Sequence, residues 1–457
     1  MTAQGKRPPL FGTNGIRGIP NEDLTVEFSM KIGAAAGTYF SQDTVAMGRD
    51  TRSTGPMIFN AVSSGIMAAG KNVLDLGVLP TPAVQYYCKT HAVPGVVITA
   101  SHNPPQFNGI KCIASDGTEL SRSEEEKIED IYYESSFRYS GWGNAGNLIR
   151  VNDAIDIYLD GVMKHVDKDA IRAYGFRVAV DAGNGASYFS APELLRRLGC
   201  TVVSLNAYPD GHFTSRNSEP KPENLMDLIN VVRNGKFSLG IAHDGDADRA
   251  VFVDEKGNFI DGDTILSLIV SSVTKPGDRV VTPISSSDAI DEICRKNGAE
   301  LIRTRVGAPI VSRTMIEMGA RIGGEENGGI IYGPHQYCRD GAMTAGLVLN
   351  LMASRGERIS ELIKDVPEFH IHKLSVERKV PWEQISKFVR QYAGKARIES
   401  SDGLKIFFED GWVLMRPSGT EPIIRIYGQS RTAKRAAELA EEYRSLVEGI
   451  QDGASAL

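Results

Sequence analysis

Cysteine is scarce in this chain, and no two cysteines have the spacing of a metal site or a redox motif. Five are scattered through the 457 residues, at Cys88, Cys112, Cys200, Cys294 and Cys338, without a CxxC pair. A small secreted protein stabilised by disulfides would carry an even number at closer spacing. We therefore expect free thiols in a reducing cytosol.

Long apolar runs, basic segments and nucleotide-binding fingerprints are also missing. No apolar stretch approaches the ~20 residues that span a bilayer, and residues 1–9 have no apolar core of a secretory signal. The net charge of -6 and the lack of a basic run disfavour nucleic acid as a partner. Neither GxxxxGK followed by Ser or Thr, nor a GxGxxG that opens a helix, is present. The sequence therefore predicts a cytoplasmic protein that binds neither membrane nor nucleic acid.

Glycine, by contrast, is plentiful, and many of the 47 glycines follow short runs of β-branched residues. Helical spacing at 24–40 and 55–70 alternates with apolar runs at 44–50, 72–78 and 95–100. This alternation is typical of a parallel sheet flanked by helices. The same alternation of helical segments and apolar runs occurs twice more further along the chain.

A chain of this length is too long for one hydrophobic core, and we predict four domains. Three similar α/β domains with parallel or mixed sheets occupy 1–150, 151–256 and 257–368, and an α+β domain with an antiparallel sheet occupies 369–457. An internal duplication is indicated by LPTPAVQYY at 79–87 and VGAPIVSRTM at 306–315, each followed by a strand and a polar loop. We expect the final residues, 451–457, to fray.

The first chemically informative loop is TASHNPP at 99–105, with NGIK at 108–111 behind it. Ser101 comes directly after a buried strand, at the end of the sheet where α/β proteins usually bind ligands. The Pro-Pro pair holds the loop in place. A serine that only caps a turn explains the same segment equally well when the loop is taken alone.

The second loop, DGDADR, places Asp244, Asp246 and Asp248 at alternate positions. Their charges repel one another unless a cation lies between them, and oxygen ligands favour a hard ion such as Mg2+. An EF-hand is an alternative, because Glu255 falls at its twelfth position, but Arg249 stands where that loop needs glycine. A solvated acidic turn is the other alternative.

Two further loops have the composition of ligand-binding segments. GGEENGG at 323–329 combines two acids and an amide with four glycines, which suits recognition of sugar hydroxyls beside closely approaching backbone. A plain glycine turn is its alternative. RPSGTEP at 416–422, with Arg425 behind it, combines arginine, hydroxyls and backbone N–H groups into a cradle for an anion such as phosphate.

Taken together with FGTNGIRG at 11–18, these loops resemble the alpha-D-phosphohexomutase superfamily. The agreement runs in the same order over essentially the whole chain, with lesser similarities at DAGNG (181–185) and TRVG (304–307). The resemblance implies three similar α/β domains and a fourth domain around one central cleft, with one loop from each. It also implies an isomerase that moves a phosphoryl group between two hydroxyls of one hexose.

The resemblance assigns a role to the residues of each loop. Ser101 would be the phosphoserine, and it would bind one Mg2+ together with Asp244, Asp246 and Asp248, while Arg249 stabilises the transferring phosphoryl group. The residues implied in proton transfer or in orienting the serine loop are Arg17, Lys111 and His102. Those implied in substrate binding are Glu325 and Asn327 for the sugar hydroxyls, and Arg416, Ser418, Gly419, Thr420 and Arg425 for the phosphate that does not react.

One position departs from the family pattern. Many relatives have a histidine at the end of the sugar loop, where this chain has Gly329. His335 is a candidate replacement, and a surface or loop histidine is the alternative interpretation of that residue.

The expected substrate is a small phosphosugar, and the reaction would pass through a hexose 1,6-bisphosphate that also serves as activator. FGTNGIRG looks like phosphoglucosamine mutases, whereas EENGG looks like archaeal-type mutases that include phosphomannomutase/phosphoglucomutases of broad specificity. We predict a mutase that favours glucosamine phosphate, with the broad enzyme as the alternative. A non-catalytic sugar-phosphate binding protein would be expected to have lost Ser101 or an aspartate, and a plain phosphatase would need free access of water. The sequence fits a monomer or a homodimer.

Overall fold

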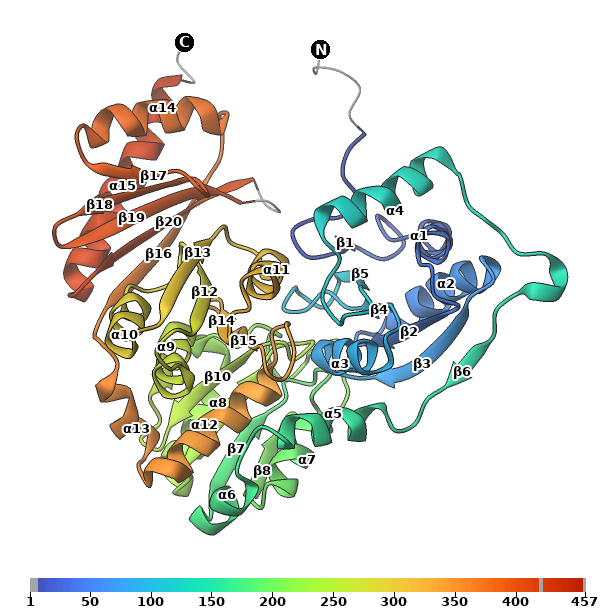
Figure 1. The fold of residues 1–457 in the computed structure, drawn as a ribbon. Helices are drawn as coiled ribbons and strands as arrows, with labels where there is room; N and C mark the ends of the chain where they lie inside the picture. The colour runs from blue at the N-terminus through green and yellow to red at the C-terminus, as the bar shows by residue number, and fades with distance from the viewer. Residues whose placement is uncertain (1–6, 419–421, 455–457) are drawn as a thin grey trace.

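Four β-sheets follow one another along the chain, each with its own helices (Figure 1). The computed structural model describes residues 7–418 and 422–454. Three sheets mix parallel and antiparallel pairs, and the fourth is wholly antiparallel. In Figure 1 the first sheet lies on the right and the fourth at the upper left, with the second and third between them. The predicted class, three α/β domains and a C-terminal α+β domain, is confirmed.

The first sheet carries β4, the strand that leads into Ser101. Its strands, in spatial order, are β1 (Ile16–Gly18), β5 (Asn108–Ile113), β4 (Gly95–Ile98), β2 (Thr44–Arg49), β3 (Asn72–Val78) and β6 (Leu148–Arg150). Val96 and Ile98 of β4 belong to one core cluster and Val97 to another. The strand is therefore buried on both faces, as its continuous apolar run predicts.

The second and third sheets follow in the middle of the chain. The second, in spatial order, is β11 (Phe259–Ile260), β10 (Ala250–Asp254), β9 (Leu239–His243), β7 (Arg177–Asp181) and β8 (Thr201–Leu205). The third is β13 (Glu300–Thr304), β12 (Arg279–Pro283), β14 (Ile322–Gly324) and β15 (Ile330–Tyr332). Because β11 pairs with β10, the second sheet continues past residue 256, where we expected its domain to end.

The first three sheets share one topology, which puts three loops in equivalent places. In each sheet three consecutive strands run parallel, and the third of them turns back into an antiparallel neighbour: β4 into β5, β9 into β10 and β14 into β15. The connecting loops are 99–107, 244–249 and 325–329. The strand before each loop is preceded by α3 (Thr81–His91), α8 (Met226–Gly235) or α11 (Ala308–Met318). The predicted internal repeat is therefore present, and it has three units.

The fourth sheet is covered by α14 (Trp382–Ala393) and α15 (Ala433–Ala454). Its order is β16 (His370–Glu377), β20 (Ile423–Ser430), β19 (Gly411–Pro417), β18 (Leu404–Phe408) and β17 (Arg397–Glu399). The prediction that the tail frays is wrong for its first residues, because Gln451 is buried in α15. Its side chain accepts from the Lys379 N–H at 2.6 Å and donates to the Glu377 carbonyl at 3.0 Å. Residues 455–457 lie outside the described part.

The remaining helices cover the sheets and join the domains. They are α1 (Val26–Tyr39), α2 (Gly55–Ala68), α4 (Arg122–Glu134), α5 (Ala154–Met163), α6 (Lys168–Tyr174), α7 (Ser190–Arg197), α9 (Gly262–Val273), α10 (Ala289–Asn297), α12 (Gly341–Arg355) and α13 (Ile359–Leu362). One buried cluster runs from Ala46 through Tyr158 to Leu362, so the three α/β units share a continuous core. No helix within the described ranges is long and apolar enough to cross a membrane.

Candidate active site

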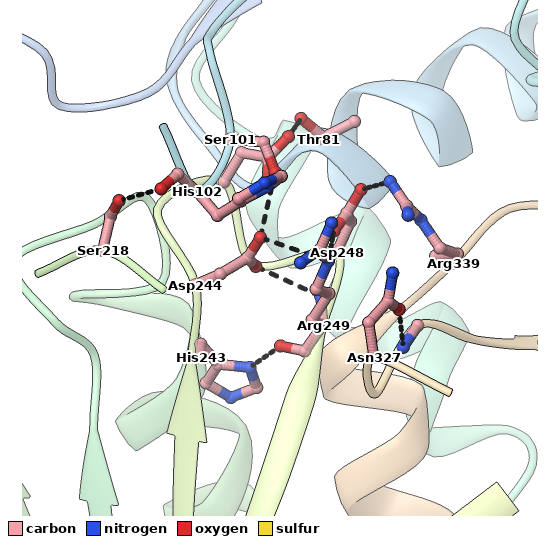
Figure 2. A network of polar contacts seen from close by, with 12 residues as sticks. Thr81, Ser101, His102, Ser218, His243, Asp244, Asp248, Arg249, Asn327 and Arg339 are labelled. Carbon is pink, nitrogen blue, oxygen red and sulfur yellow. Dashed lines mark hydrogen bonds and ion pairs between the residues drawn. The ribbon is translucent and has the colours of Figure 1, made fainter. Parts of the chain in front are cut away.

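Ser101 lies beyond the carboxyl end of β4, where the backbone conformation is unusual. Its φ is 52°, in the left-handed region that residues other than glycine seldom adopt. The Ser101 N–H donates to Thr99 Oγ1 at 2.8 Å. The Ser101 hydroxyl donates to Asp244 Oδ2 at 3.0 Å (Figure 2). The residue is fully buried. The hydroxyl is thus aimed from the first domain at a carboxylate of the second.

A buried arginine that the motif analysis missed, Arg52, holds the serine loop in shape. Its guanidinium donates to four backbone carbonyls within 101–107, at 2.6 to 2.8 Å, and its Nε donates to Asp50 at 3.1 Å. Asp50 also accepts from the Thr99 hydroxyl at 2.6 Å. Arg52 therefore fixes the loop backbone. The only signal in the sequence was an acid and a base directly after a strand.

Three buried carboxylates face Ser101 from the loop between β9 and β10. Asp244, Asp246 and Asp248 each offer an oxygen within 4.8 Å of the others. Two of the carboxylate oxygens, Asp246 Oδ1 and Asp248 Oδ1, are buried and lack a hydrogen-bond partner among the described residues. Orphaned carboxylate oxygens are costly, and an oxygen-only set of this kind fits Mg2+. Because β10 starts at Ala250, directly after this loop, the EF-hand alternative is wrong.

The pKa values of Asp244 and Asp246 shift in opposite directions because their partners differ. Burial raises the pKa of Asp244 above its usual range, and repulsion from Asp248 and Asp246 adds to this effect. Burial also opposes ionisation of Asp246, but Lys111 and the Thr81 hydroxyl outweigh it and hold the pKa of that carboxyl below its usual range. Lys111 Nζ lies 2.9 Å and Thr81 Oγ1 2.7 Å from Asp246 Oδ2. Both donors belong to the first domain, so two domains complete the aspartate loop.

Positive side chains surround Ser101 and the aspartates. Arg249 Nε lies 3.8 Å from both the Asp244 and the Asp248 carboxylates and has no hydrogen-bond partner within the described ranges. Arg17, on β1, donates to the Asn103 side chain. Arg249, burial and Arg17 together lower the pKa of His102, which keeps its imidazole neutral. A cluster of guanidinium groups beside a serine suits a phosphoryl anion.

The third loop brings a buried acid and a half-buried amide to the same region. Glu325 Oε1 accepts from the Gly307 N–H at 3.2 Å, and Oε2 accepts from Arg339 at 2.8 Å. Asn327 Oδ1 accepts from the Gly329 N–H at 3.1 Å, so this oxygen already shapes the loop (Figure 2). Arg339 donates to Asp248 as well, which joins the third loop to the aspartates. No motif pointed to Arg339.

His335 does not lie in the sugar loop but inside a buried aromatic cluster. It is 2% exposed and stacks on Tyr86, with ring centroids 4.7 Å apart. Its Nε2 lies 3.3 Å from the Asp340 carboxylate, and His165 packs edge-on at 5.3 Å. His335 is a loop residue, in the turn after β15, but it is buried, so only the surface part of the alternative interpretation is wrong. The ring packs against α3, so His335 does not fill the position left empty by Gly329.

The fourth domain contributes two arginines on neighbouring strands. Arg416 and Arg425 are directly opposite in the β19–β20 pair, and like charges in that position repel unless an anion lies near. Arg416 Nε donates to Asp402 at 3.1 Å, and Asp402 accepts from the Val306 N–H of the third domain at 2.9 Å. Ser418 is buried beside them. The two other expected members of this cradle, Gly419 and Thr420, lie outside the described residues.

Comparisons with known proteins agree with this arrangement. Residues 8–139, 156–257, 261–369 and 373–446 match, in order, the alpha/beta/alpha domains I, II and III and the C-terminal domain of phosphoglucomutase/phosphomannomutase. A phosphoglucomutase/phosphomannomutase of Thermococcus kodakarensis is 43% identical over 454 residues, which cover 97% of this chain and 99% of the relative. A phosphoglucosamine/phosphogalactosamine mutase of Sulfurisphaera tokodaii is 38% identical over 452 residues, with coverage of 96% and 99%.

A solved structure shows the same fold. The phosphoglucomutase/phosphomannomutase family protein of Burkholderia thailandensis has a TM-score of 0.87 at 26% identity, covering 97% of this chain and 98% of that one. The four-domain fold and its loops define a phosphosugar mutase, which is an isomerase. The chain belongs to the alpha-D-phosphohexomutase superfamily.

Proposed function

We propose that this protein interconverts the 6-phosphate and the 1-phosphate of a hexose, with glucosamine phosphate preferred, through a phosphorylated Ser101. The observation that carries the proposal is the 3.0 Å contact between the Ser101 hydroxyl and Asp244. A buried serine with left-handed backbone, aimed at clustered carboxylates, is a costly arrangement for a folded protein. A phosphoryl group on Ser101 and a cation bound by the carboxylates would account for this cost, because the cation offsets the repulsion between the negative charges.

The carboxylates of Asp244, Asp246 and Asp248 would hold one Mg2+, together with a phosphoryl oxygen on Ser101. When bound, this ion supplies neutralising charge to the phosphoryl oxygens. Lys111 and Thr81 keep Asp246 ionised and in place for it.

Each half-reaction exchanges one bond to phosphorus. A sugar hydroxyl attacks the phosphorus on Ser101, its oxygen–phosphorus bond forms, and the serine oxygen–phosphorus bond breaks. The attacking hydroxyl loses a proton and the serine oxygen gains one, and we assign this exchange to Lys111 and Arg17. Arg249 stabilises the charge on the transferring group, and His102 orients the loop. The product is a hexose 1,6-bisphosphate, which turns round and returns its other phosphoryl group to Ser101.

Substrate binding would divide between the third and fourth domains. We assign the sugar hydroxyls to Glu325 and Asn327. The phosphate that does not react would be held by Arg416, Ser418, Gly419, Thr420 and Arg425. A cradle on a separate domain can hold either end of the bisphosphate and open between the half-reactions.

The preferred sugar follows from the opening motif at 11–18, and the second relative is itself named for hexosamine phosphates. The second candidate is a mutase of mannose and glucose phosphates, the activity in the name of the Thermococcus relative. Discrimination between such sugars needs only about 1–3 kcal/mol. We also propose that a hexose 1,6-bisphosphate primes the enzyme. Its location would be the cytoplasm, where buried free thiols stay reduced.

The test is a mutase assay with the 1-phosphates of glucosamine, mannose and glucose, in Mg2+ and primed by hexose 1,6-bisphosphate. We expect the highest kcat/KM for glucosamine 1-phosphate and no turnover of any sugar by Ser101→Ala. Ser354→Ala, at an exposed position of α12, is the control and should match the wild type. Substantial turnover by Ser101→Ala would refute the phosphoserine route. A higher kcat/KM for mannose or glucose phosphate would assign the protein to the second candidate.

A further inference from the structure

Arg339 lies where the loops of the first three domains meet. It directly precedes Asp340, the N-cap residue of α12, and is 5% exposed. Its guanidinium donates to Glu325 at 2.8 Å. It also donates to Asp248 (Figure 2). The Asn14 amide, in the orientation that also donates to Glu119, accepts from the same guanidinium at 3.2 Å. One side chain thus joins the opening motif, the aspartate loop and the sugar loop.

The backbone that carries Arg339 is held from two sides. The Asp340 N–H donates to the Ile330 carbonyl at 2.9 Å, directly after the sugar loop. The Gly341 N–H donates to the Ala247 carbonyl at 3.3 Å, inside the aspartate loop. The Asp340 carboxylate is also fixed, by Tyr158 at 2.6 Å and Gln336 at 2.8 Å. The guanidinium is therefore delivered from a segment that is attached to both loops it contacts.

The alkyl part of Arg339 fills the space beside Gly329. A Cβ built on Gly329 would lie 2.2 Å from Arg339 Cδ and 3.0 Å from its Cγ. The φ of Gly329 is outside the left-handed region, so the backbone conformation does not require glycine at this position. The close contact with Arg339 does. A side chain at 329 and the present position of Arg339 exclude each other.

We propose that Arg339 is the positioning residue of the sugar loop, acting from the space that a side chain at 329 would otherwise occupy. The proposal rests on the mutase function proposed above. Arg339 orients Glu325 as an acceptor for sugar hydroxyls and shares Asp248 with the metal site. A guanidinium suits this role, because its planar fork binds two carboxylates at fixed angles and an ammonium does not.

Loss of Arg339 has opposite consequences for sugar and for metal. Glu325 loses the donor that orients it, so the KM for hexose phosphate rises. Asp248 loses a competing cation, so Mg2+ binds more tightly. A general loosening of the structure would weaken both kinds of binding, which separates the two explanations.

The first test compares Arg339→Ala and Arg339→Lys with the wild type. We expect Arg339→Ala to raise the KM for glucosamine 1-phosphate by about tenfold or more, and to lower the Mg2+ Kd by about threefold in titration calorimetry without sugar. Arg339→Lys keeps one positively charged hydrogen-bond donor, so its KM should lie between those of the wild type and Arg339→Ala. An unchanged KM, or weaker Mg2+ binding, would overturn the proposal.

A second variant keeps the guanidinium and displaces it. Gly329→Ala puts a methyl group against Arg339 Cδ and should raise KM as Arg339→Ala does, but it should have no further effect in the double variant. Gly143→Ala is the matched control, because a Cβ there meets nothing within 4 Å. Additive effects of the two substitutions would overturn the proposal. If Arg339→Ala fails to fold, an unchanged KM in Gly329→Ala would overturn it. A wild type without mutase activity would instead refute the proposed function, and the Mg2+ titrations would still report whether 329 and 339 are coupled.

Discussion

The backbone at Ser101 is held on both sides in a conformation that costs roughly 1–3 kcal/mol. Thr99 accepts its N–H, and Arg52 donates to its carbonyl at 2.8 Å. Asp50 connects these two side chains, since it accepts from both. The Ser101 hydroxyl is therefore positioned by residues that bond to the backbone of its loop.

The residue that carries most of this support is Arg52. We expect Arg52→Leu to lower the free energy of unfolding by about 3 kcal/mol, because it leaves Asp50 buried without its partner. The kcat should fall by roughly a hundredfold, because a misplaced nucleophile loses its alignment. Urea unfolding and steady-state kinetics measure the two effects. Arg196→Leu, on the exposed side of α7, should change neither. A normal kcat in Arg52→Leu would show that the loop holds its shape without these bonds.

A second residue-scale prediction concerns Asp263, near the amino-terminal end of α9. Burial raises its pKa from 3.8 to about 7, with Glu326 adding to the rise and Lys373 opposing it. Between these values the folded state binds more protons than the unfolded state, so stability falls as pH rises from about 4 to 7. Asp263→Asn removes the effect and should be more stable than the wild type at pH 8, by roughly 1–3 kcal/mol. Urea unfolding at pH 5 and pH 8 tests this, and a gap between the two proteins that does not widen with pH would refute it.

At the scale of the elements, the serine and aspartate loops approach each other through a glycine. A Cβ on Gly245 would lie 2.4 Å from the Ser101 carbonyl oxygen. Backbone cannot move aside as a flexible side chain can, so the close approach needs glycine. The two hairpin loops can then bring the serine hydroxyl within hydrogen-bond distance of Asp244.

Gly245→Ala should therefore separate the two loops. We expect kcat to fall by about a hundredfold or more, while Tm falls by only a few degrees because the hairpin strands themselves are unchanged. Gly449→Ala, in α15, adds the same methyl group where a Cβ meets nothing within 4 Å, and it should retain full activity. Wild-type turnover by Gly245→Ala would mean that the loops need not touch.

The sequence predicts elements and loops well where a pattern is long, and poorly where it is short. The periodicities at 55–70 and 72–78 correspond to α2 and β3. The strand β15 has three residues and was missed, because no period can be recognised in so short a run. The sequence singles out the residues of the four loop motifs because each motif combines residue types that seldom occur together in a structural loop. Arg52 and Arg339 were missed because their roles depend on carbonyls and carboxylates that only the fold brings near.

At the scale of the whole molecule, the fourth domain has its own core and a defined contact with the third. Trp412 is fully buried in a cluster with Ile284 of the third domain, Leu414 and Tyr427. Lys405 Nζ donates to the Ile284 carbonyl at 2.8 Å and lies 4.0 Å from the Trp412 ring. This contact sets the direction from which Arg416 and Arg425 meet the other loops.

Trp412→Ala should loosen that contact. We expect a loss of about 3–5 kcal/mol in stability from the cavity. We also expect a rise in KM that exceeds the change in kcat, because the residues proposed to bind phosphate are displaced while the serine and aspartate loops are not. Trp142→Ala, at a fully exposed position, is the control. Steady-state kinetics are measured at a temperature where both variants are folded. An unchanged KM in Trp412→Ala would show that the contact with the third domain does not position the fourth-domain arginines for substrate binding.

The most direct measurement follows the phosphoryl group on Ser101 through one turnover. The protein is phosphorylated with hexose 1,6-bisphosphate whose phosphoryl groups carry 18O, freed of excess, and mixed with a stoichiometric amount of unlabelled glucosamine 6-phosphate in Mg2+. The label on the Ser101 peptide and on the sugars is then followed over time by mass spectrometry. We expect labelled phosphate to leave Ser101 and to appear on glucosamine in an equal amount, first as the 1,6-bisphosphate, and we expect Ser101→Ala to show neither event. Label that stays on Ser101 while the monophosphates interconvert would contradict the phosphoserine route.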